Sequence, residues 1–322
     1  MPDRPLPDEF ALIARFFRPL AAGEPGAFAL TDDAAVIAPP PGCELVVTTD
    51  MVVAGVHFLP DDPARLVAKK VLRVNLSDLA AMGARPRAYL LAAAFPRTLG
   101  EDWLAEFAGG LGEDQAAFGV TLIGGDTTAT DGPLTLSVTA LGEVRAGSAI
   151  RRAGARAGDS IYLSGTLGDG ALGLRVLTGG LAGLPEAARA ALVGRYRVPE
   201  PRVSLGVRLV GLAHAAIDVS DGLMADLGHI AEASGVAAEV EASTLPFSSA
   251  ARAALEADPA LLAAALAGGD DYELLFTVDP GSDSSVRELS DALGLALTRI
   301  GRVRAGAGVR VLDRSGAPIA LE

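Results

Sequence analysis

Six aspartates of this sequence each lie beside an apolar segment, where an ionised carboxylate is unfavourable unless a cation or hydrogen-bond donors compensate it. They are Asp33, Asp50, Asp78, Asp126, Asp218 and Asp221. Several have hydroxyl neighbours, among them Thr48, Thr49 and Ser220. A cation shared between several of these side chains would compensate them together, so the set predicts a metal site. For any single member, a turn or a helix cap is the alternative.

The chain has only three histidines and one cysteine, so nearly all candidate ligands are oxygens and no zinc-type spacing occurs. Oxygen ligands favour a hard cation, and we expect Mg²⁺. Protein-bound Mg²⁺ is often held by one or two carboxylates together with substrate phosphates. The acidic set therefore predicts phosphate chemistry.

Two familiar phosphate-binding motifs are absent: there is no GxxxxGK[ST] loop and no protein-kinase catalytic set. Lysine occurs only at Lys69 and Lys70. Metal ions would therefore carry most of the charge stabilisation in a phosphoryl transfer, aided by an arginine and backbone N–H groups. Gly124 and Gly125 would let the backbone approach a phosphate, although Gly-Gly-Asp is also an ordinary turn.

The elements that must position these side chains alternate between strands and helices. The first half predicts strands at residues 44–49, 89–95, 120–123 and 134–141 and helices at 63–83 and 101–118. Asp50 and Asp126 would then follow strands and Asp218 would end one, which is where open α/β sheets place their ligand sites. Asp78 lies inside a helix, one turn after Asn75 and on the same side.

The second half continues the mixed α/β pattern after a loop-like run at residues 146–158. It predicts strands at residues 160–164, 215–219, 237–240, 272–278 and 297–303 and helices at 170–178, 185–196, 201–212, 223–233 and 248–256. A length of 322 residues suits two domains. We therefore predict an α/β (α+β) protein with domains at residues 1–147 and 148–322.

The composition excludes two classes of partner. A formal net charge of −13 argues against a protein that wraps nucleic acid or binds an anionic membrane, since both require a basic face. Apolar runs such as residues 89–95 are too short to span a membrane. Cys43 is the only cysteine, and the N-terminal residues have no basic segment followed by an apolar one, so we expect a cytoplasmic protein.

Three further polar features could contact a ligand. His57 follows Asp50 closely and could meet a substrate phosphate, but an isolated histidine is more often structural. Arg152 could reach nucleotide phosphates from the interdomain loop, or it could be a solvated linker residue. The run GGDDYE from Gly268 to Glu273 suits a substrate lip or an ordinary turn.

These segments together resemble the thiamine-monophosphate kinase family, in the superfamily that includes aminoimidazole ribonucleotide synthetase. The most specific matches are NLSDLAAMGA, IGGDTT and DVSDGL, and further matches run from FALIARFF and TDDAAVIAP to GGDDYELLFTV. The motifs keep the family's order from residue 10 to residue 278.

The resemblance implies transfer of the γ-phosphoryl group of ATP to thiamine monophosphate, giving thiamine pyrophosphate directly and with several Mg²⁺ ions. It implies metal ligands at Asp33, Asp50, Asp78, Asp126, Asp218 and Asp221, with Thr48 and Thr49 nearby. As a hypothesis on mechanism, we expect the removal of Asp126 or Asp218 to abolish turnover. Nucleotide contacts would come from Gly125, Asp126, Arg152 and Ser220, and substrate contacts from His57 and Asp270. The implied fold is a homodimer whose N-terminal strands form a β-barrel between the subunits, with ATP near the interface.

The sequence departs from the family pattern in three places. Thr31 and Asp270 stand where glycine and glutamate are usual, and the chain ends at Glu322 without the aromatic segment of many members. We therefore expect the acceptor end of the site to differ from that of other members. Two alternatives are a sibling ATP-dependent synthetase, although Cys43 beside a Pro-Gly turn does not match the reactive cysteines of those enzymes, and a non-catalytic nucleotide-binding regulator.

Overall fold

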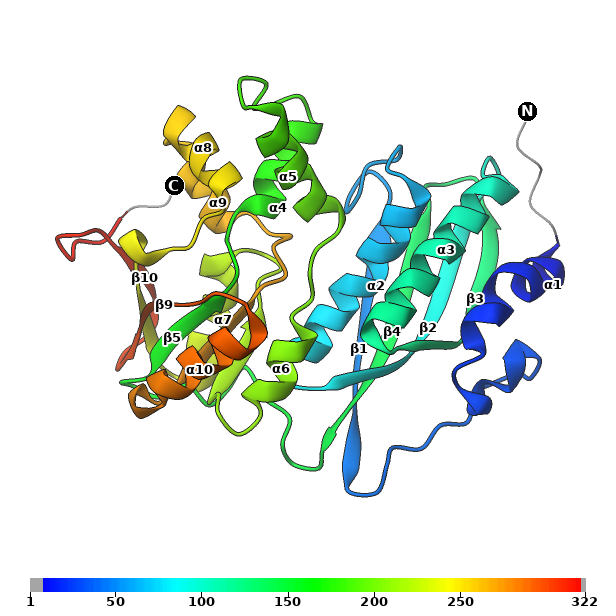
Figure 1. Cartoon of the computed structure of the whole chain (residues 1–322), viewed down its shortest axis with the longest axis horizontal. Helices are drawn as coiled ribbons and strands as arrows, with labels where there is room; N and C mark the ends of the chain where they lie inside the picture. Colours follow the sequence, from blue (N-terminus) through cyan, green and yellow to red (C-terminus); the bar gives the residue numbers. More distant parts are fainter. Residues whose placement is uncertain (1–7, 320–322) are drawn as a thin grey trace. The chain divides into compact units, whose positions relative to one another are not determined.

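The computed structural model describes residues 8–319, which form two compact units. One unit contains the residues up to Leu79 and Ala84–Gly147, and the other contains Ala80–Gly83 and the residues from Ser148 onward. Each unit is built on its own β-sheet (Figure 1). No helix among residues 8–319 is long and apolar enough to cross a membrane.

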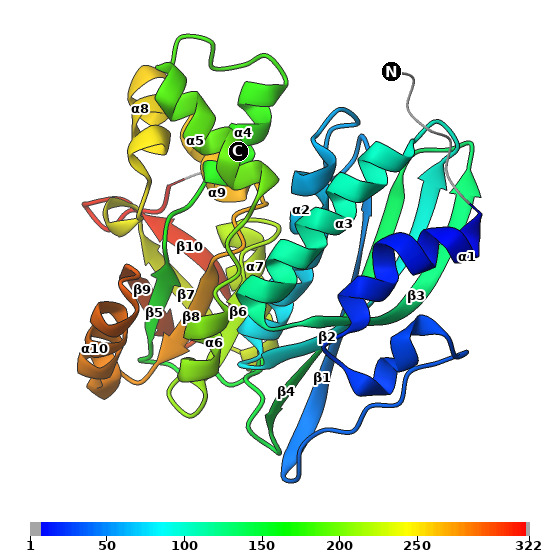
Figure 2. The ribbon, with the colours of Figure 1, turned by 45° about the vertical axis from the view of Figure 1, so that its right-hand side comes forward.

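The first unit has a four-stranded sheet in the order β1-β4-β2-β3. Its elements are α1 (Glu9–Leu12), η1 (Ile13–Phe17), η2 (Arg18–Ala21), η3 (Pro25–Leu30), β1 (Cys43–Val53), α2 (Ala64–Ala81), β2 (Arg85–Pro96), α3 (Glu101–Phe118), β3 (Thr121–Thr130) and β4 (Thr135–Arg145). The β2–β3 pair is parallel and the other two pairs are antiparallel. Helices α2 and α3 lie side by side over one face of this sheet (Figures 1 and 2).

Helix α2 ends where the sequence predicts. Gly83 adopts a left-handed conformation with φ of 71°, which costs a glycine little. Its N–H bonds to Ala80 O at 2.9 Å, and Ala84 N–H bonds to Leu79 O at 2.8 Å. These bonds satisfy the last carbonyls of the helix and turn the chain into β2.

The two faces of the first sheet differ in burial. Val46, Leu91 and Val138 point toward α2 and α3 and are buried. The opposite face, here called the open face, exposes 59% of Val47 and 58% of Met51. Large apolar side chains on an uncovered sheet face are a feature of protein interfaces.

The second unit has a six-stranded mixed sheet in the order β10-β7-β9-β5-β8-β6. Its strands are β5 (Ser160–Ser164), β6 (Ala215–Asp218), β7 (Ala237–Glu241), β8 (Leu274–Val278), β9 (Leu297–Arg304) and β10 (Gly308–Leu312). Its helices are α4 (Asp169–Leu177), α5 (Glu186–Arg197), α6 (Val203–Leu209), α7 (Leu223–Ser234), α8 (Ser249–Ala257), α9 (Leu261–Ala267) and α10 (Asp283–Leu293), with short turns η4 (Ala242–Thr244) and η5 (Pro280–Ser282).

This second sheet has a hydrophobic core on each face, because the side chains of its central strands alternate. Ile161, Ile217 and Leu275 pack with α7 on one face. Tyr162 and Phe276 stack on the other face, with ring centroids 5.6 Å apart, and pack with α6 and α10. With both faces covered, the sheet is a rigid support for the loops at its strand ends.

Candidate active site

Two aspartates of the first unit lie between β1 and α2. Thr48 and Asp50 share the helix-covered face of β1, because side chains two residues apart in a strand point the same way. The Thr48 hydroxyl donates to Asp78 Oδ2 at 2.6 Å, and the Asp50 backbone N–H donates to Asn75 Oδ1 at 3.0 Å. Asn75 and Asp78 are one turn apart on α2, so a single helix face supplies both partners, as predicted.

The setting of Asp50 favours a nearby cation. Burial, with a smaller contribution from the charge of Asp78, raises the pKa of Asp50 to about 6, while the nearby His57 ring acts in the opposite direction. A cation beside the two carboxylates would relieve their repulsion and favour the ionised form. The donors are oxygens, which fits Mg²⁺ better than a soft metal.

Asp126 and Thr49 lie on the opposite face of the same sheet. Asp126 pairs in register with Ala92, Ala92 with Ser137, and Ser137 with Met51. Residues paired in this way point to the same side of a sheet, so Asp126 lies on the open face with Met51. Both Asp126 and Thr49 are exposed. Within one chain, the first unit therefore does not bring Asp126 to the two helix-covered aspartates.

The expectation that three aspartates project from strand ends is wrong for two of them. Asp50 lies inside β1 and Asp126 inside β3, whereas Asp218 is the last residue of β6. The reason is that both strands continue beyond the apolar run that marked them, through polar residues and glycine. Hydrogen bonding to neighbouring strands keeps these residues extended.

The two glycines before Asp126 are part of β3 rather than a turn. The strand continues through Gly124 and Gly125 after a bulge in its pairing with β2. A side chain at Gly125 would overlap the carbonyl oxygen of Leu91, and its φ is 151°. The close approach of β2 is therefore sufficient to explain glycine at this position.

His57 closes a turn at the end of β1. Its Nδ1 accepts the backbone N–H of Val53 at 3.1 Å, and its own backbone N–H donates to Val53 O at 3.0 Å. An accepting Nδ1 carries no proton, so the neutral ring is protonated on Nε2, which is its donor atom. His57 is exposed at the surface of the unit.

Asp33 is exposed in a loop that follows a left-handed turn. Phe28, Ala29 and Leu30 have φ of 49°, 53° and 55°, a conformation that residues with a Cβ rarely adopt. The hydroxyl of Thr31 closes the turn by donating to Phe28 O at 2.7 Å. Thr31 itself has φ of −113°, so the backbone does not need the glycine that is usual in the family.

Among residues 8–319, no group of three or more His, Cys, Asp or Glu side chains is arranged to hold a metal ion. The predicted ligands of the first unit lie on both faces of its sheet and, for Asp33, in a loop. No one of these groups would fill the coordination shell of a metal ion by itself. Other ligands, such as substrate phosphates, would therefore complete the shell.

The second unit presents Asp218, Ser220 and Asp221 where β6 ends. Asp218 is buried, and the loop that follows it carries the other two. Asp226, in the first turn of α7, accepts the backbone N–H groups of Asp221 and Gly222 at 3.1 and 3.0 Å. Asp226 thereby fixes this loop. Asp226 is not among the residues predicted from the sequence, although an acid four residues after a glycine at a helix start indicates such a cap.

Arg152 and Asp270 occupy different surroundings in the second unit. The Arg152 side chain is exposed, and its backbone carbonyl accepts a hydrogen bond from Ser234 Oγ at 3.3 Å. Asp270 is half-buried and precedes β8, which begins at Leu274 rather than at the predicted Tyr272. The Asp270 N–H donates to Ser220 O at 3.0 Å, so Asp270 lies beside the Asp218 loop.

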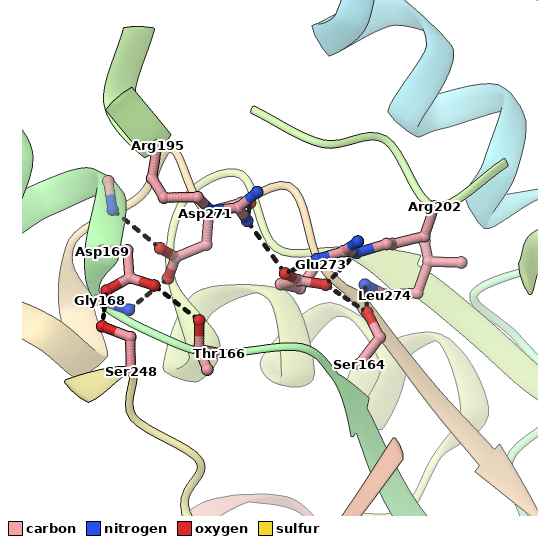
Figure 3. Close-up of polar contacts among 11 residues, drawn as sticks. Ser164, Thr166, Gly168, Asp169, Arg195, Arg202, Ser248, Asp271, Glu273 and Leu274 are labelled. Atoms are coloured by element: carbon pink, nitrogen blue, oxygen red, sulfur yellow. Dashed lines mark hydrogen bonds and ion pairs between the residues drawn. The ribbon is translucent and has the colours of Figure 1, made fainter. Parts of the chain in front are cut away.

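In the run after Asp270, Asp271 and Glu273 are buried in a polar network (Figure 3). Glu273 accepts two hydrogen bonds from Arg202, at 2.6 and 2.5 Å, and one from Arg195 at 3.0 Å. Ser164 Oγ donates to its Oε2 at 2.6 Å. Charge-assisted and bidentate bonds of this kind are the strong ones in proteins.

Asp271 and Asp169 complete the network around the start of α4. Asp271 accepts the backbone N–H groups of Gly168 and Gly170 at 2.7 and 3.0 Å. Asp169 accepts the hydroxyl groups of Thr166 and Ser248 at 2.6 and 2.5 Å. Each buried carboxylate therefore has at least two donors, as burial of a charge requires.

The burial of Asp271 predicts a pH dependence of stability. Burial raises the pKa of Asp271 from its ordinary value of 3.8 to about 7, despite the bonds from Gly170 and Gly168. A carboxyl whose pKa is raised on folding contributes stability that is fully present below about pH 4 and is lost as the pH rises through about 7. The complete change corresponds to about 4 kcal/mol.

Urea unfolding of the metal-free protein between about pH 5 and pH 8 measures this effect. The wild-type protein should lose stability with rising pH relative to Asp271→Asn, which cannot ionise. Parallel pH profiles of the two proteins would show that Asp271 stays ionised in the fold.

Comparison with known proteins identifies the fold and the family. Residues 31–144 match the family model for the N-terminal domain of AIR synthase related proteins. Residues 156–314 match the model for the C-terminal domain of the same family. A thiamine-monophosphate kinase of Caulobacter vibrioides is 46% identical over 306 residues, which are 94% of this chain and 86% of that protein.

Solved structures agree with these sequence matches. The thiamine-monophosphate kinase of Stenotrophomonas maltophilia has 46% identity and a TM-score of 0.85, covering 97% of this chain and 98% of that one. A protein named AaThiL, complexed with AMPPCP and TMP, has 32% identity and a TM-score of 0.77, covering 97% and 94%. With the expected motifs, the two-domain fold and this identity along nearly the whole chain, the protein belongs to the thiamine-monophosphate kinase family.

Proposed function

We propose that this protein transfers the γ-phosphoryl group of ATP to the phosphate of thiamine monophosphate, giving thiamine pyrophosphate and ADP. The observation that carries the proposal is 46% identity to a thiamine-monophosphate kinase over 94% of the chain. In the reaction, an oxygen of the acceptor phosphate forms a bond to the γ-phosphorus while the bond to the β-phosphate oxygen breaks, and ADP leaves.

The residues proposed to act divide into three groups. The metal ligands are Asp33, Thr48, Thr49, Asp50, Asp78, Asp126, Asp218 and Asp221; the nucleotide contacts are Gly125, Asp126, Arg152 and Ser220; and the acceptor contacts are His57 and Asp270. Mg²⁺, when bound, would neutralise charge that develops on the transferred phosphoryl group. The aspartates would hold it, and backbone N–H groups and Arg152 would orient the phosphates.

The support for these roles differs between residues. A cation near Asp50 and Asp78 is favoured by the repulsion between these two carboxylates. A cation near Asp218 is favoured by the burial of its side chain. His57 lies in the turn that follows β1, where its Nδ1 accepts the backbone N–H of Val53 at 3.1 Å. The Thr49 hydroxyl lies on the open face, where it donates to Val138 O at 3.1 Å.

The test is to incubate the purified protein with Mg²⁺ and ATP plus thiamine monophosphate, thiamine or no acceptor, and to separate the products by chromatography. Thiamine pyrophosphate and ADP should appear only with the monophosphate. ADP formation without an acceptor would favour a sibling synthetase. Binding of Mg-ATP without any product would favour a nucleotide-binding regulator.

We also propose that the protein acts as a homodimer in the cytoplasm, where ATP is available. The support for the dimer is the open face of the first sheet, which exposes Val47, Met51 and Leu90 and also carries Asp126. A second copy of the chain on this face would cover its apolar side chains, as in a barrel made of two sheets. Asp126 would then lie at the subunit interface.

Met51→Glu is expected to dissociate this dimer. An unpaired carboxylate buried at an interface is unfavourable by about 3–5 kcal/mol, which would raise the dissociation constant at least about a hundredfold. Analytical ultracentrifugation over a range of concentrations measures the change. Val207→Glu, at an exposed apolar position of α6, is the control and should remain dimeric. A wild-type protein that sediments as a monomer would contradict the proposal.

A further inference from the structure

The segment before β8 has an unusual backbone. Asp270 and Tyr272 have φ of 69° and 52°, in a region that non-glycine residues rarely occupy. The N–H groups of both residues are nevertheless bonded, Asp270 to Ser220 O at 3.0 Å and Tyr272 to Val219 O at 2.8 Å. The segment therefore forms one side of the loop that carries Ser220.

Between these two residues, the side chain of Asp271 turns into the protein and is 1% exposed. Its two oxygens accept the N–H groups of Gly168 and Gly170, at the start of α4 (Figure 3). N–H groups at a helix start have no partner within the helix, so the carboxylate satisfies donors that would otherwise be unpaired.

The start of α4 also packs directly on the unusual backbone. A side chain at Gly170 would overlap the carbonyl group of Asp270, and a side chain at Gly269 would overlap the carbonyl oxygen of Ser220. The position of Asp270 is thus fixed from two sides, by α4 through Asp271 and by the Ser220 loop. Left-handed residues persist only where the surroundings determine them in this way, and such residues concentrate at functional sites.

We propose that Asp271 is a positioning residue for the phosphate acceptor, which holds Asp270 in its left-handed conformation beside the Ser220 loop. Asp271 is buried and does not touch the acceptor itself; Asp270 presents its carboxylate to the acceptor. This inference rests on the proposed function and on the role of Asp270 in acceptor binding.

Asp169 provides a matched control. It is the neighbouring buried carboxylate at the start of α4, and it is 2% exposed. Its two carboxylate oxygens accept the hydroxyl groups of Thr166 and Ser248, whereas those of Asp271 accept the N–H groups of Gly168 and Gly170. If buried acids here only stabilise the fold, Asp169→Asn and Asp271→Asn should have the same effects.

The experiment compares the full-length wild-type protein with Asp271→Asn and Asp169→Asn by steady-state kinetics and by hydrogen exchange of the peptide around Asp270. Asp271→Asn should raise KM for thiamine monophosphate on the order of tenfold, with KM for ATP changed less than about twofold. It should also speed exchange at the Asp270 and Tyr272 amides. Asp169→Asn should change neither KM nor this exchange.

Equal effects of the two variants on acceptor KM, or unchanged exchange in Asp271→Asn, would overturn the proposal. If Asp271→Asn does not fold, Gly170→Ala replaces it, because its new methyl group displaces the Asp270 carbonyl while leaving Asp271 intact. A wild-type protein that makes no thiamine pyrophosphate would refute the proposed function alone, since the exchange comparison still decides whether Asp271 positions Asp270.

Discussion

Asp218→Asn and Asp126→Asn should each lower kcat at least about a hundredfold while the protein remains folded, since the loss of one group that stabilises transition-state charge typically has an effect of this size. Asparagine keeps the size of the side chain and removes the charge that a cation requires. Asp218 is buried at the end of β6, whereas Asp126 is exposed on the open face. The two variants therefore test one chemical role in two structural settings.

The measurement is kcat at saturating ATP, thiamine monophosphate and Mg²⁺, with circular dichroism as the test of folding. Asp131→Asn is the control for Asp126, because Asp131 is 92% exposed just after β3. It should retain wild-type turnover. If either of the two site variants has a nearly normal kcat, that aspartate does not hold a catalytic metal ion.

The sequence predicted the elements that have a clear apolar pattern. The first part of β1 follows from its β-branched residues, and the end of the helix that contains Asp78 follows from the glycine at residue 83. The spacing of Asn75 and Asp78 predicts that they share one helix face, and the structure shows that this face contacts β1.

Short and polar elements could not be predicted in the same way. Helix α10 buries only Val286, and β10 is a five-residue strand with arginine and glycine in it, so neither has a strong apolar pattern. The turns between Glu9 and Leu30 include three left-handed residues, which no propensity would suggest. Tertiary contacts determine these segments.

Only part of the arrangement of the site could be predicted from the sequence. Thr48 and Thr49 are neighbours in a strand, so alternation already requires that their side chains lie on opposite faces. The face of Asp126, in contrast, depends on a bulge in the pairing of β2 and β3. The partners of Glu273 are distant from it in the sequence, since Arg202 precedes it by 71 residues. Sequence spacing carries no information on such a contact.

Glu273→Ala should destabilise the protein by about 3–5 kcal/mol, which is the usual effect of removing one member of a buried ion pair. The Glu273 side chain is fully buried, and those of Arg195 and Arg202 are only 25% and 18% exposed. The substitution would leave both guanidinium groups without this carboxylate and would leave Ser164 without its acceptor. The unpaired charges, rather than the lost contacts, produce most of the effect.

Urea unfolding followed by circular dichroism measures this free energy, and Glu239→Ala is the matched control in the same unit. Glu239 pairs with Arg304, whose side chain is 53% exposed, so its removal should change stability by less than about 1 kcal/mol. Glu273→Gln separates charge from shape: because it keeps the size of the side chain but not its charge, it should remain close to Glu273→Ala. A loss below about 1 kcal/mol in Glu273→Ala would mean that water reaches both arginines once the carboxylate is gone, and that the network does not hold the second unit together.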